Sequence, residues 1–446
     1  MSGHGDYYEE KSKSCISHSE IPAELYDKYD VKKGLRDRNG KGVITGITNI
    51  SKVDGYRTVN GVREPIEGVL AYRGYSIEDL VKRRDGVHGF EETSYLLLFG
   101  ELPGAADLAE YRNVVNSNLD LPSNFVKTVI LRENCRDIMN TMARAVLELE
   151  ALDEDINDFS VPHVLEQCVK IASLLPMFAV YGYHAYNHYD RSQSLIIHRP
   201  DPGLSVAENI LMMLRPDGKF TESEASALDA ALIIHMEHGG GNNSAFTTRV
   251  ITSAGSDTYS VIAGALLSLK GPKHGGANIK VVQMMDDIKA NVLDLTDEGE
   301  LENYLNKILK GEAFDGMGLI YGMGHAVYSI SDPRAKLLKE YAIKLAHEKG
   351  WEDELALYER IARIGPKVIS QKRKAPVCVN VDYYSGFIYR MLGIPEELYT
   401  PLFAIARVPG WSAHRIEELV SSGKIIRPAY VSNAKDRDYI PMEKRH

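Results

Sequence analysis

The chain has 446 residues, of which 44% are hydrophobic and 26% charged, and this ordinary globular composition excludes a disordered, fibrous or small disulfide-stabilised protein. Its 52 basic and 62 acidic residues give a net charge of −10, so no overall field attracts nucleic acid or an anionic membrane. The longest apolar stretch, around Ile171 to Tyr183, is interrupted by Ser173 and Pro176 and falls short of the about 20 residues of a bilayer span. The four cysteines form no C-x-x-C pair and follow no secretory segment, which predicts reduced thiols in a soluble, cytoplasmic protein.

The first segment, residues 1 to about 42, is polar and charged, and we expect it to form an arm on the surface or on a partner subunit. Two short β-prone pieces follow, Val43 to Val53 and Val69 to Tyr75, and each predicts a strand. Helical signals then take over, with a helix start at Ser76 and a helix from Phe90 to Phe99.

Farther along the chain, apolar residues recur three and four apart, which predicts helices. This pattern covers Leu108 to Leu152, Ser160 to Tyr183, Val206 to Leu214, a helix opened by the capping box of Thr221 and Glu224 and running toward His238, Tyr259 to Lys270, a helix from Ala277, and one from Asp332-Pro333 to Lys349. No series of strands alternates with helices as a doubly wound sheet requires, so the predicted fold class is mainly α.

Four glycine-bounded segments place histidine, aspartate or asparagine at the ends of apolar helices, where binding sites are commonly built. In the first, His235 and His238 would share a helix face and could hold a metal, or the segment is a helix C-cap with a buried histidine. In the second, His274 stands between a helix stop and two glycines, where one ring nitrogen can be fixed and the other presented to a substrate; an exposed turn histidine is the alternative.

The third segment, Gly322 to Arg334, carries His325 and ends with an arginine near a helix start, which suits an anion, although this segment taken alone favours a surface arginine after a proline turn. The fourth, Val377 to Gly386, delivers Asp382 to the start of a helix, where an aspartate is either a reactive carboxylate or an N-cap.

Read together and in order, these segments resemble the citrate synthase family, from about Val43 to Pro428. The resemblance rests on the histidine-glycine segment at His238, GP-x-HGGAN at His274, GHAV with DPR at His325 and Arg334, NVD-x-x-SG at Asp382, Ala406-Arg407 followed by GW, Arg427-Pro428, and, in the N-terminal half, YRGYSIEDL and FEETSYLLLFGELP.

The resemblance implies a two-domain, nearly all-α fold with a large helical domain, a smaller mobile helical domain and minor β-structure near the N-terminus. The large domain would comprise residues 1–275 and 384–446 and include the N-terminal arm and the interface of a homodimer. The small domain, residues 276–383, would lie on the CoA side and close over the substrates.

The reaction that the resemblance implies is a Claisen-type condensation of acetyl-CoA with oxaloacetate, followed by hydrolysis of citryl-CoA to citrate, with no cofactor and no metal. Asp382 would remove the α-proton, His274 would donate to the enolate oxygen, and His325 would polarise the ketone and protonate the new alkoxide. The substrate carboxylates would be held by four basic side chains, His238, Arg334, Arg407 and Arg427. By the same analogy, Arg427 would reach the partner subunit's active site.

The match has departures. Residues 328 to 331, YSIS, stand where many members carry a basic residue that meets CoA phosphate, and the cluster of Lys372, Arg373 and Lys374 could supply that charge or be a solvated turn. Met323 replaces a small or aromatic residue of the family, and Gly239 stands where an acidic residue is frequent.

Four alternatives remain open from the sequence. A 2-methylcitrate synthase would use propionyl-CoA with the same groups, because one methylene in a pocket changes discrimination by only about 1 to 3 kcal/mol. A citryl-CoA cleaving enzyme, a metallohydrolase built on the two histidines and a catalytically inactive helical scaffold are the others.

Overall fold

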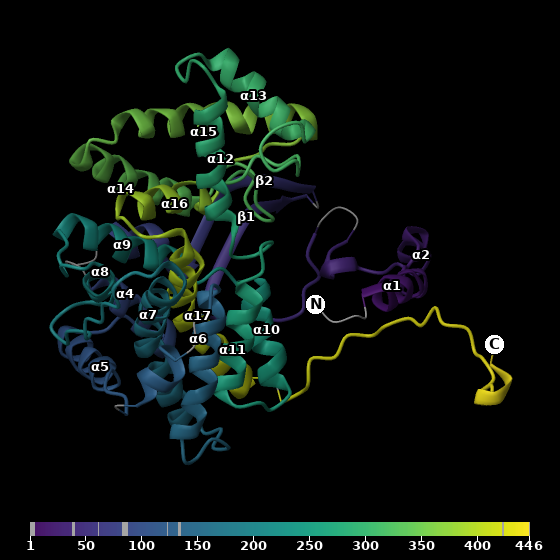
Figure 1. The fold of residues 1–446 in the computed structure, drawn as a ribbon, viewed down its shortest axis with the longest axis horizontal. Helices are drawn as coiled ribbons and strands as arrows, with labels where there is room; N and C mark the ends of the chain where they lie inside the picture. Colours follow the sequence, from purple (N-terminus) through teal and green to yellow (C-terminus); the bar gives the residue numbers. More distant parts are fainter. Residues whose placement is uncertain are drawn as a thin grey trace. The chain divides into compact units, whose positions relative to one another are not determined.

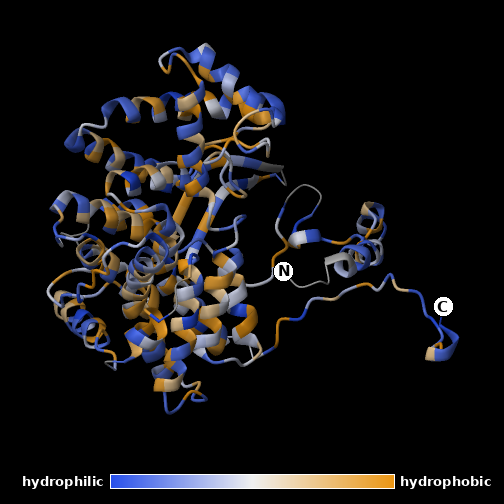
Figure 2. Ribbon diagram, viewed as in Figure 1, coloured by the Kyte–Doolittle hydropathy of each residue, from blue (hydrophilic) through white to orange (hydrophobic). Residues whose placement is uncertain are grey.

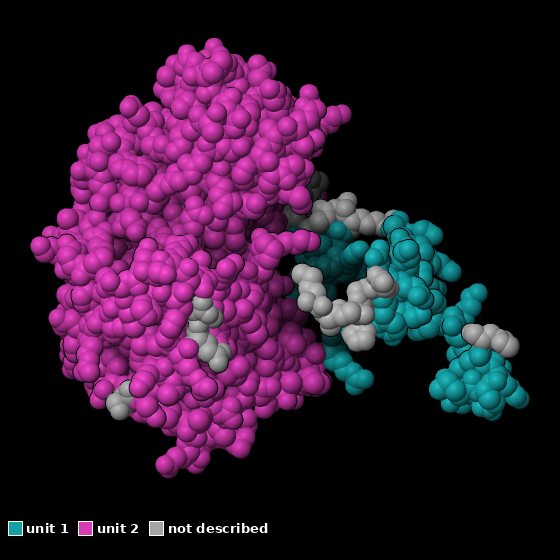
Figure 3. All heavy atoms as spheres, viewed as in Figure 1, with its two compact units in different colours: residues 1–46, 427–446 teal, residues 47–426 magenta. Residues whose placement is uncertain are grey.

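The computed structural model describes residues 5–37, 41–60, 62–82, 88–122, 124–132, 135–421 and 423–445. The chain forms two compact units, one comprising Met1–Gly46 with Arg427–His446 and the other Ile47–Ile426 (Figure 3). The predicted arm falls in the first unit. The predicted division into large and small domains concerns the second unit and the C-terminal segment, and it stays a prediction.

The terminal unit contains helices α1 (Gly5–Ser19) and α2 (Ala23–Lys28) and two short 3-10 turns, η1 (Lys33–Leu35) and η5 (Met442–Lys444) (Figure 1). Neither α2 nor the two turns buries a residue. The segments between these elements also leave large apolar side chains in solvent, among them Ile44 at 85% exposure, Tyr430 at 93% and Tyr439 at 82%.

The 47–426 unit begins with a three-stranded antiparallel sheet of β1 (Ser51–Val59), β2 (Val62–Tyr72) and β3 (Tyr75–Ser76) in the order β1-β2-β3. The β1–β2 register pairs Ser51 with Tyr72 and Val59 with Val62, with a bulge near Asp54. The strand expected at Val43 to Val53 is wrong for most of its length, since β1 starts at Ser51. Asn60, which follows β1, has a φ of 50°, and the Asn-Gly sequence at positions 60 and 61 is typical of hairpin turns.

Helices make up most of this unit, which confirms the mainly α prediction. They are α3 (Ile77–Lys82), α4 (Gly89–Phe99), α5 (Ala105–Ser117), α6 (Ile138–Glu148), α7 (Val161–Arg191), α8 (Val206–Leu214), α9 (Glu222–His235), α10 (Asn243–Ser253), α11 (Thr258–Leu269), α12 (Ala277–Asn291), α13 (Glu298–Lys310), α14 (Pro333–Lys349), α15 (Glu352–Arg373), α16 (Val381–Met391) and α17 (Tyr399–Ser421), with short turns η2 (Val126–Ile130), η3 (Leu149–Leu152) and η4 (Glu396–Leu398).

The core of the unit is organised around α17, which packs against α7, α10, α4 and α9 and buries nearly all of its residues. A second set of contacts joins α14 to α16 and α12 to α16. Hydrophobic residues recur along the central strands and helices, whereas α13 is largely hydrophilic on the face shown (Figure 2). Residues of α17 thus lie at the centre of this unit, where they meet α9 and α10.

Helix α7 contains Ser173 and Pro176, the two residues that interrupt the apolar stretch in the sequence, and it covers the helix expected from Ser160 to Tyr183. Among the described helices, it is the one with the length and apolar character of a membrane span, and 78% of the window that qualifies is buried inside the protein. That burial is typical of a core helix.

Candidate active site

The first histidine segment lies in a tight turn between α9 and α10. The predicted helix toward His238 is wrong at its end, because α9 stops at His235. The two rings therefore do not share a helix face, and His235 instead bonds through Nδ1 to the carbonyl of Ala231 at 2.7 Å. In the part of the chain that the structure describes, no group of three His, Cys, Asp or Glu side chains is arranged to hold a metal.

Tyr72 of β2 holds this turn in place. Its hydroxyl accepts the backbone N–H of Glu237 at 3.2 Å and lies 3.1 Å from the carbonyl oxygens of Ile233 and Glu237. His238 is 9% exposed. Burial and the charges of Arg334, His325 and Arg407 keep its pKa well below the usual value, so the ring is neutral.

His325 lies against His238, with ring centroids 5.0 Å apart. Its Nδ1 accepts the backbone N–H groups of Val327 at 3.1 Å and Tyr328 at 3.2 Å. A ring nitrogen that accepts is unprotonated, so the proton of the neutral ring is on Nε2. The backbone thus fixes the tautomer in which His325 Nε2–H is a donor.

Tyr328, one of the departures from the family pattern, is a packing residue of this site. It is 1% exposed, and its ring stacks on His325 at 4.8 Å and meets His238 edge-on at 5.5 Å. The guanidinium carbon of Arg334 lies 5.7 Å from the same ring. Tyr328 therefore supports the histidines, and another of the departures, Met323, packs its sulfur onto Gly365 of α15.

Two buried arginines face this group of side chains. Arg334, 3% exposed, is paired through Nε and Nη2 with the carboxylate of Asp332, the N-cap of α14, at 3.0 and 2.8 Å. Arg407 of α17, 1% exposed, donates through Nε to the carbonyl of His235 at 2.8 Å. Both arginines are therefore buried and held in place by hydrogen bonds. The alternative that Arg334 is a surface arginine after a proline turn is wrong.

Two polar atoms of these residues have no hydrogen-bond partner among the described residues, although both are buried: Arg407 Nη1 and His238 Nε2. Buried donors are nearly always satisfied. A pair of orphaned nitrogen atoms beside a second arginine is the arrangement expected where a ligand with acceptor oxygens binds.

His274 lies in the turn between α11 and α12. Its Nε2 accepts the backbone N–H of Ser244 at 3.3 Å and lies 3.0 Å from the Ser244 hydroxyl, which in turn accepts the indole N–H of Trp411 at 3.1 Å. The ring proton is therefore on Nδ1. Burial, together with the charge of Arg407, lowers the pKa of His274 to about 4, so it is a neutral donor at physiological pH.

Asp382 is the second residue of α16, and the N-cap is Asn380, whose Oδ1 accepts the Asp382 N–H at 3.0 Å. The N-cap interpretation of Asp382 is thus wrong. Burial raises the pKa of Asp382 to about 6, against the opposing charges of Arg334 and Arg407. A carboxylate with this pKa is poised to act as a base near neutral pH.

These electrostatic influences connect the site: Arg407 acts on His238, His274 and Asp382, and Arg334 acts on His238 and Asp382. The structure therefore brings together six of the predicted residues, His238, His274, His325, Arg334, Asp382 and Arg407. Arg427 lies in the terminal unit, so its role stays a prediction.

The basic cluster of Lys372, Arg373 and Lys374 forms the exposed end of α15. Lys372 donates to the carbonyl of Leu309 at 2.8 Å. Arg373 Nη1 lies 3.8 Å from the position that a Cβ on Gly324 would take, next to His325. Arg373 is thus the member of the cluster that lies close to Gly324, the residue before His325.

Sequence reasoning missed the supporting residues Ser244, Asp332, Tyr328 and Glu237. Asp332 gave a signal, because an aspartate directly before Pro333 is typical of an N-cap. Ser244 and Glu237 gave none, since they bond to His274 and His414, which are far away along the chain, and Tyr328 was noted only as a departure from the family pattern.

The family model for the citrate synthase C-terminal domain matches residues 36–429. The chain belongs to the citrate synthase family. Citrate synthase of Corynebacterium glutamicum is 36% identical over 390 residues, covering 85% of this chain and 84% of that protein. The same organism's 2-methylcitrate synthase 2 is 33% identical over 421 residues, with 93% and 98% covered. The chain is thus an acyltransferase of the condensing type, similar to enzymes of both specificities.

Solved structures agree on the fold. Citrate synthase from Thermotoga maritima matches with a TM-score of 0.72 and 31% identity over 93% of this chain and 99% of that one. The Thermoplasma acidophilum enzyme, solved as a ternary complex with carboxymethyl coenzyme A and oxaloacetate, matches with a TM-score of 0.75 and 28% identity, also over 93% and 99%. The citrate synthase fold is therefore shown.

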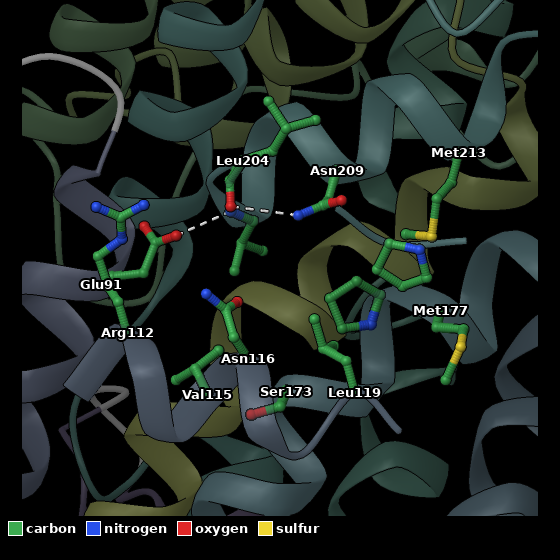
Figure 4. A pocket seen from close by; sticks show the side chains of 13 residues that line it. Glu91, Arg112, Val115, Asn116, Leu119, Ser173, Met177, Leu204, Asn209 and Met213 are labelled. Carbon is green, nitrogen blue, oxygen red and sulfur yellow. Dashed lines mark hydrogen bonds between the residues drawn. The ribbon is translucent and has the colours of Figure 1, made fainter. Parts of the chain in front are cut away.

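A separate cavity of about 20 Å³, room for one water, lies beside α4, α5 and α7 (Figure 4). Glu91 lines it and accepts the N–H of Val206 at 2.8 Å, while its other oxygen is buried without a partner among the described residues. Burial first, and then the charge of Asp229, raises the pKa of Glu91 to about 8. This carboxyl is therefore protonated at neutral pH.

Proposed function

We propose that this enzyme is a citrate synthase, which condenses acetyl-CoA with oxaloacetate and hydrolyses the resulting citryl-CoA. The observation that carries the proposal is the pair of orphaned buried nitrogen atoms, Arg407 Nη1 and His238 Nε2, beside Arg334, Asp382 and the tautomer-fixed His325. This group combines an anion site with a base and oriented proton donors, which are the parts that the reaction needs.

Oxaloacetate would bind first through its carboxylates. Arg407 Nη1 and the free donors of Arg334 would pair with carboxylate oxygens, and neutral His238 would donate through Nε2 once its proton is placed there. The ketone oxygen would then face His325 Nε2–H. Because this donor is fixed by two backbone N–H groups, it polarises the ketone without having to reorient.

Enolisation of acetyl-CoA would use Asp382 and His274. Asp382 takes a proton from the methyl group, and the electron pair moves to the thioester oxygen, which accepts a hydrogen bond from His274 Nδ1–H. The methyl carbon then forms a bond to the ketone carbon of oxaloacetate, and the ketone oxygen takes the proton of His325 Nε2. Water finally cleaves the citryl thioester to give citrate and CoA.

The phosphates of CoA would meet the exposed end of α15. Arg373 is the best candidate of the three basic residues, because its guanidinium approaches the Gly324–His325 turn. Lys372 and Lys374 would add charge at the same helix end. Residues 328 to 331 are excluded from this role by their lack of a basic side chain.

The active assembly would be a homodimer in which Arg427 completes the partner's oxaloacetate site. Support comes from the terminal unit, whose exposed apolar side chains, such as Ile44 and Tyr430, are surface that a partner chain would cover. The resemblance to the family supplies the role of Arg427.

The second candidate is a 2-methylcitrate synthase, favoured by the near end-to-end match to the Corynebacterium enzyme of that name. The deciding experiment measures release of free CoA from acetyl-CoA and from propionyl-CoA with oxaloacetate, compared by kcat/KM. We expect a preference for acetyl-CoA. A preference for propionyl-CoA would establish the second candidate, and release from neither would overturn the proposed function.

A further inference from the structure

The turn that leads into His325 is paired with the segment that leads into Asp382. Met323 of the turn and Val379 of the segment form an isolated antiparallel β-bridge. These two stretches of backbone are far apart in the sequence, and the bridge makes them neighbours in space. The proposed proton donor to the ketone and the proposed base therefore follow directly from two segments that are bonded to each other.

Asn380 makes three hydrogen bonds at this junction. Its backbone N–H donates to the carbonyl of Gly322 at 2.9 Å. Its side-chain Nδ2 donates to the carbonyl of Gly324, the residue directly before His325, at 2.9 Å. Its Oδ1 accepts the backbone N–H of Asp382 at 3.0 Å. One half-buried carboxamide thus joins the backbone next to His325 to the backbone of Asp382.

The turn also packs closely on the helix that carries Asp382. Gly322 has a φ of 76°, a conformation that favours glycine. A Cβ on Gly322 would lie 2.7 Å from Cδ2 of Tyr383 in α16 and 2.8 Å from Cγ2 of Val281 in α12. The turn therefore rests directly on the first residues of α16, with no room for an added side chain between them.

The position of the turn determines the position of the His325 ring. Its Nδ1 is held by the backbone N–H groups of Val327 and Tyr328, so the ring is oriented by the backbone around it. A shift of the turn relative to α16 would therefore move His325 Nε2–H relative to the carboxylate of Asp382. The Asn380 side chain opposes such a shift, because it is bonded to both sides.

We propose that Asn380 is a positioning residue for the condensation, which fixes the separation between His325 and Asp382. The inference rests on the proposed function, in which the two residues act on the two substrates that must form a bond. Carbon–carbon bond formation requires the reacting atoms to be about 3 to 3.5 Å apart and aligned. Asn380 acts through the two catalytic residues, and its contribution is the alignment of the ketone with the enolised acyl group.

Asn380→Ser separates this role from the capping of α16. Serine is an N-cap as good as asparagine, so it can still accept the Asp382 N–H, but its side chain is too short to reach the carbonyl of Gly324. We expect kcat for CoA release to fall by on the order of 10- to 100-fold, since a displacement of about 1 Å can cost this much. The Kd of oxaloacetate, measured by calorimetry, should be unchanged, because the arginines that hold its carboxylates are untouched.

Two results with the serine variant would overturn the proposal. If kcat were that of the wild type, the bond to the Gly324 carbonyl would have no part in alignment. If kcat and the affinity for oxaloacetate fell alike, the substitution would have disturbed the whole site, and the role of Asn380 would be structural.

Asn380→Ala removes both the cap and the bond to Gly324. It should lose kcat to the same extent as the serine variant and also unfold at a lower temperature. Asp297→Ala is the matched control, because Asp297 is the N-cap of α13, a helix without predicted site residues, and accepts two backbone N–H groups at 2.7 and 3.2 Å. Its unfolding temperature should fall while kcat stays that of the wild type.

The comparison of the variants decides between alignment and capping. A loss of kcat in Asn380→Ala that Asn380→Ser does not share would assign the effect to the cap and overturn the proposal. A wild-type enzyme that releases CoA from neither acetyl-CoA nor propionyl-CoA would instead overturn the proposed function, so the two failures are distinguishable.

Discussion

Asp382 combines two properties that a catalytic base requires, a raised pKa and a fixed place on α16. Its side chain is not used as a helix cap, because Asn380 takes that role. Its pKa of about 6 results from burial, opposed by two arginine charges. The nearby carboxylate of Asp332 differs, since it is engaged by Arg334. Of these two carboxylates, Asp382 is the one free to accept a proton.

Replacing Asp382 by glycine should abolish condensation and spare oxaloacetate binding, because in the proposed reaction the carboxylate removes a proton and does not hold the anion. Loss of a positioned base costs about 10²- to 10⁴-fold in rate. CoA release gives the rate, and the oxaloacetate-induced rise in unfolding temperature serves as the control for an intact anion site. A variant that kept most of its turnover would eliminate Asp382 as the base.

The same residue predicts an acid limb in the pH profile. With a folded-state pKa of about 6, Asp382 is the active carboxylate above pH 6 and becomes protonated as the pH falls. We expect kcat/KM for acetyl-CoA to fall about tenfold per pH unit below that value. Oxaloacetate binding, followed over the same range, should change less steeply. A limb that lies at the ordinary pKa of an aspartate would contradict the effect of burial.

The buried carboxyl of Glu91 should affect the pH dependence of stability and leave catalysis unchanged. Its folded-state pKa of about 8 lies above the value of 4.5 expected in the unfolded chain. The native state therefore holds one more proton between these values, and stability falls as the pH rises through that window. Glu91→Gln should remove a slope of up to about 1.4 kcal/mol per pH unit.

Chemical unfolding at pH 5 and pH 8, at one protein concentration, measures this effect. The variant should show the smaller difference between the two conditions, and its activity should be that of the wild type, because Glu91 lies outside the candidate site. An equal pH dependence in both proteins would show that this carboxyl is not protonated in the native state.

At the level of elements, the β1–β2 hairpin supports the turn that carries His325. A Cβ on Gly68 of β2 would lie 2.7 Å from the ring of Tyr328 and 2.9 Å from Pro333. Glycine is thus required where the segment leading to Arg334 crosses the strand, and the backbone N–H of Gly68 also donates to the Ser331 hydroxyl at 3.3 Å.

Gly68→Ala should destabilise the protein by about 1 to 3 kcal/mol, because a methyl group has no room there. It should also raise the KM for oxaloacetate, since the displaced segment carries His325 and Arg334. Thermal unfolding and steady-state kinetics measure the two effects. The control is Gly46→Ala, where a Cβ would meet nothing within 4 Å, and both properties should be unchanged. Equal behaviour of the two variants would refute the packing argument.

Helix starts and ends were largely predictable, because Thr221, Pro333 and Gly350 act locally through caps and fixed backbone angles. The bounds of strands β1 and β2 were not predictable, since these strands mix charged and apolar residues without a clean alternation. For the candidate site, the motifs predicted which residues take part, but they did not predict that these residues lie close together in space. His274 and Asp382 are 108 residues apart in the sequence, and only α10, α16 and α17 bring their partners together.

At the scale of the whole molecule, the predicted site residues are divided between the two units. Ile47–Ile426 holds six of the seven predicted catalytic and carboxylate-binding residues, and Arg427 begins the segment beyond it. The terminal unit leaves large apolar side chains such as Ile44 and Tyr430 exposed, as the proposed homodimer requires of surface that a partner covers. A dimer in which each terminal segment completes the partner's site would account for both observations.

Mixed dimers test this arrangement. Arg427→Ala and Asp382→Gly should each be inactive as homodimers. Refolded together, they should regain up to about a quarter of wild-type activity, because half of the dimers are mixed and one site in each mixed dimer is intact. Arg407→Ala mixed with Asp382→Gly is the control: both residues lie in the same unit of one chain, so no intact site forms and no activity should return. If the first mixture also stayed inactive, Arg427 would not act across the interface.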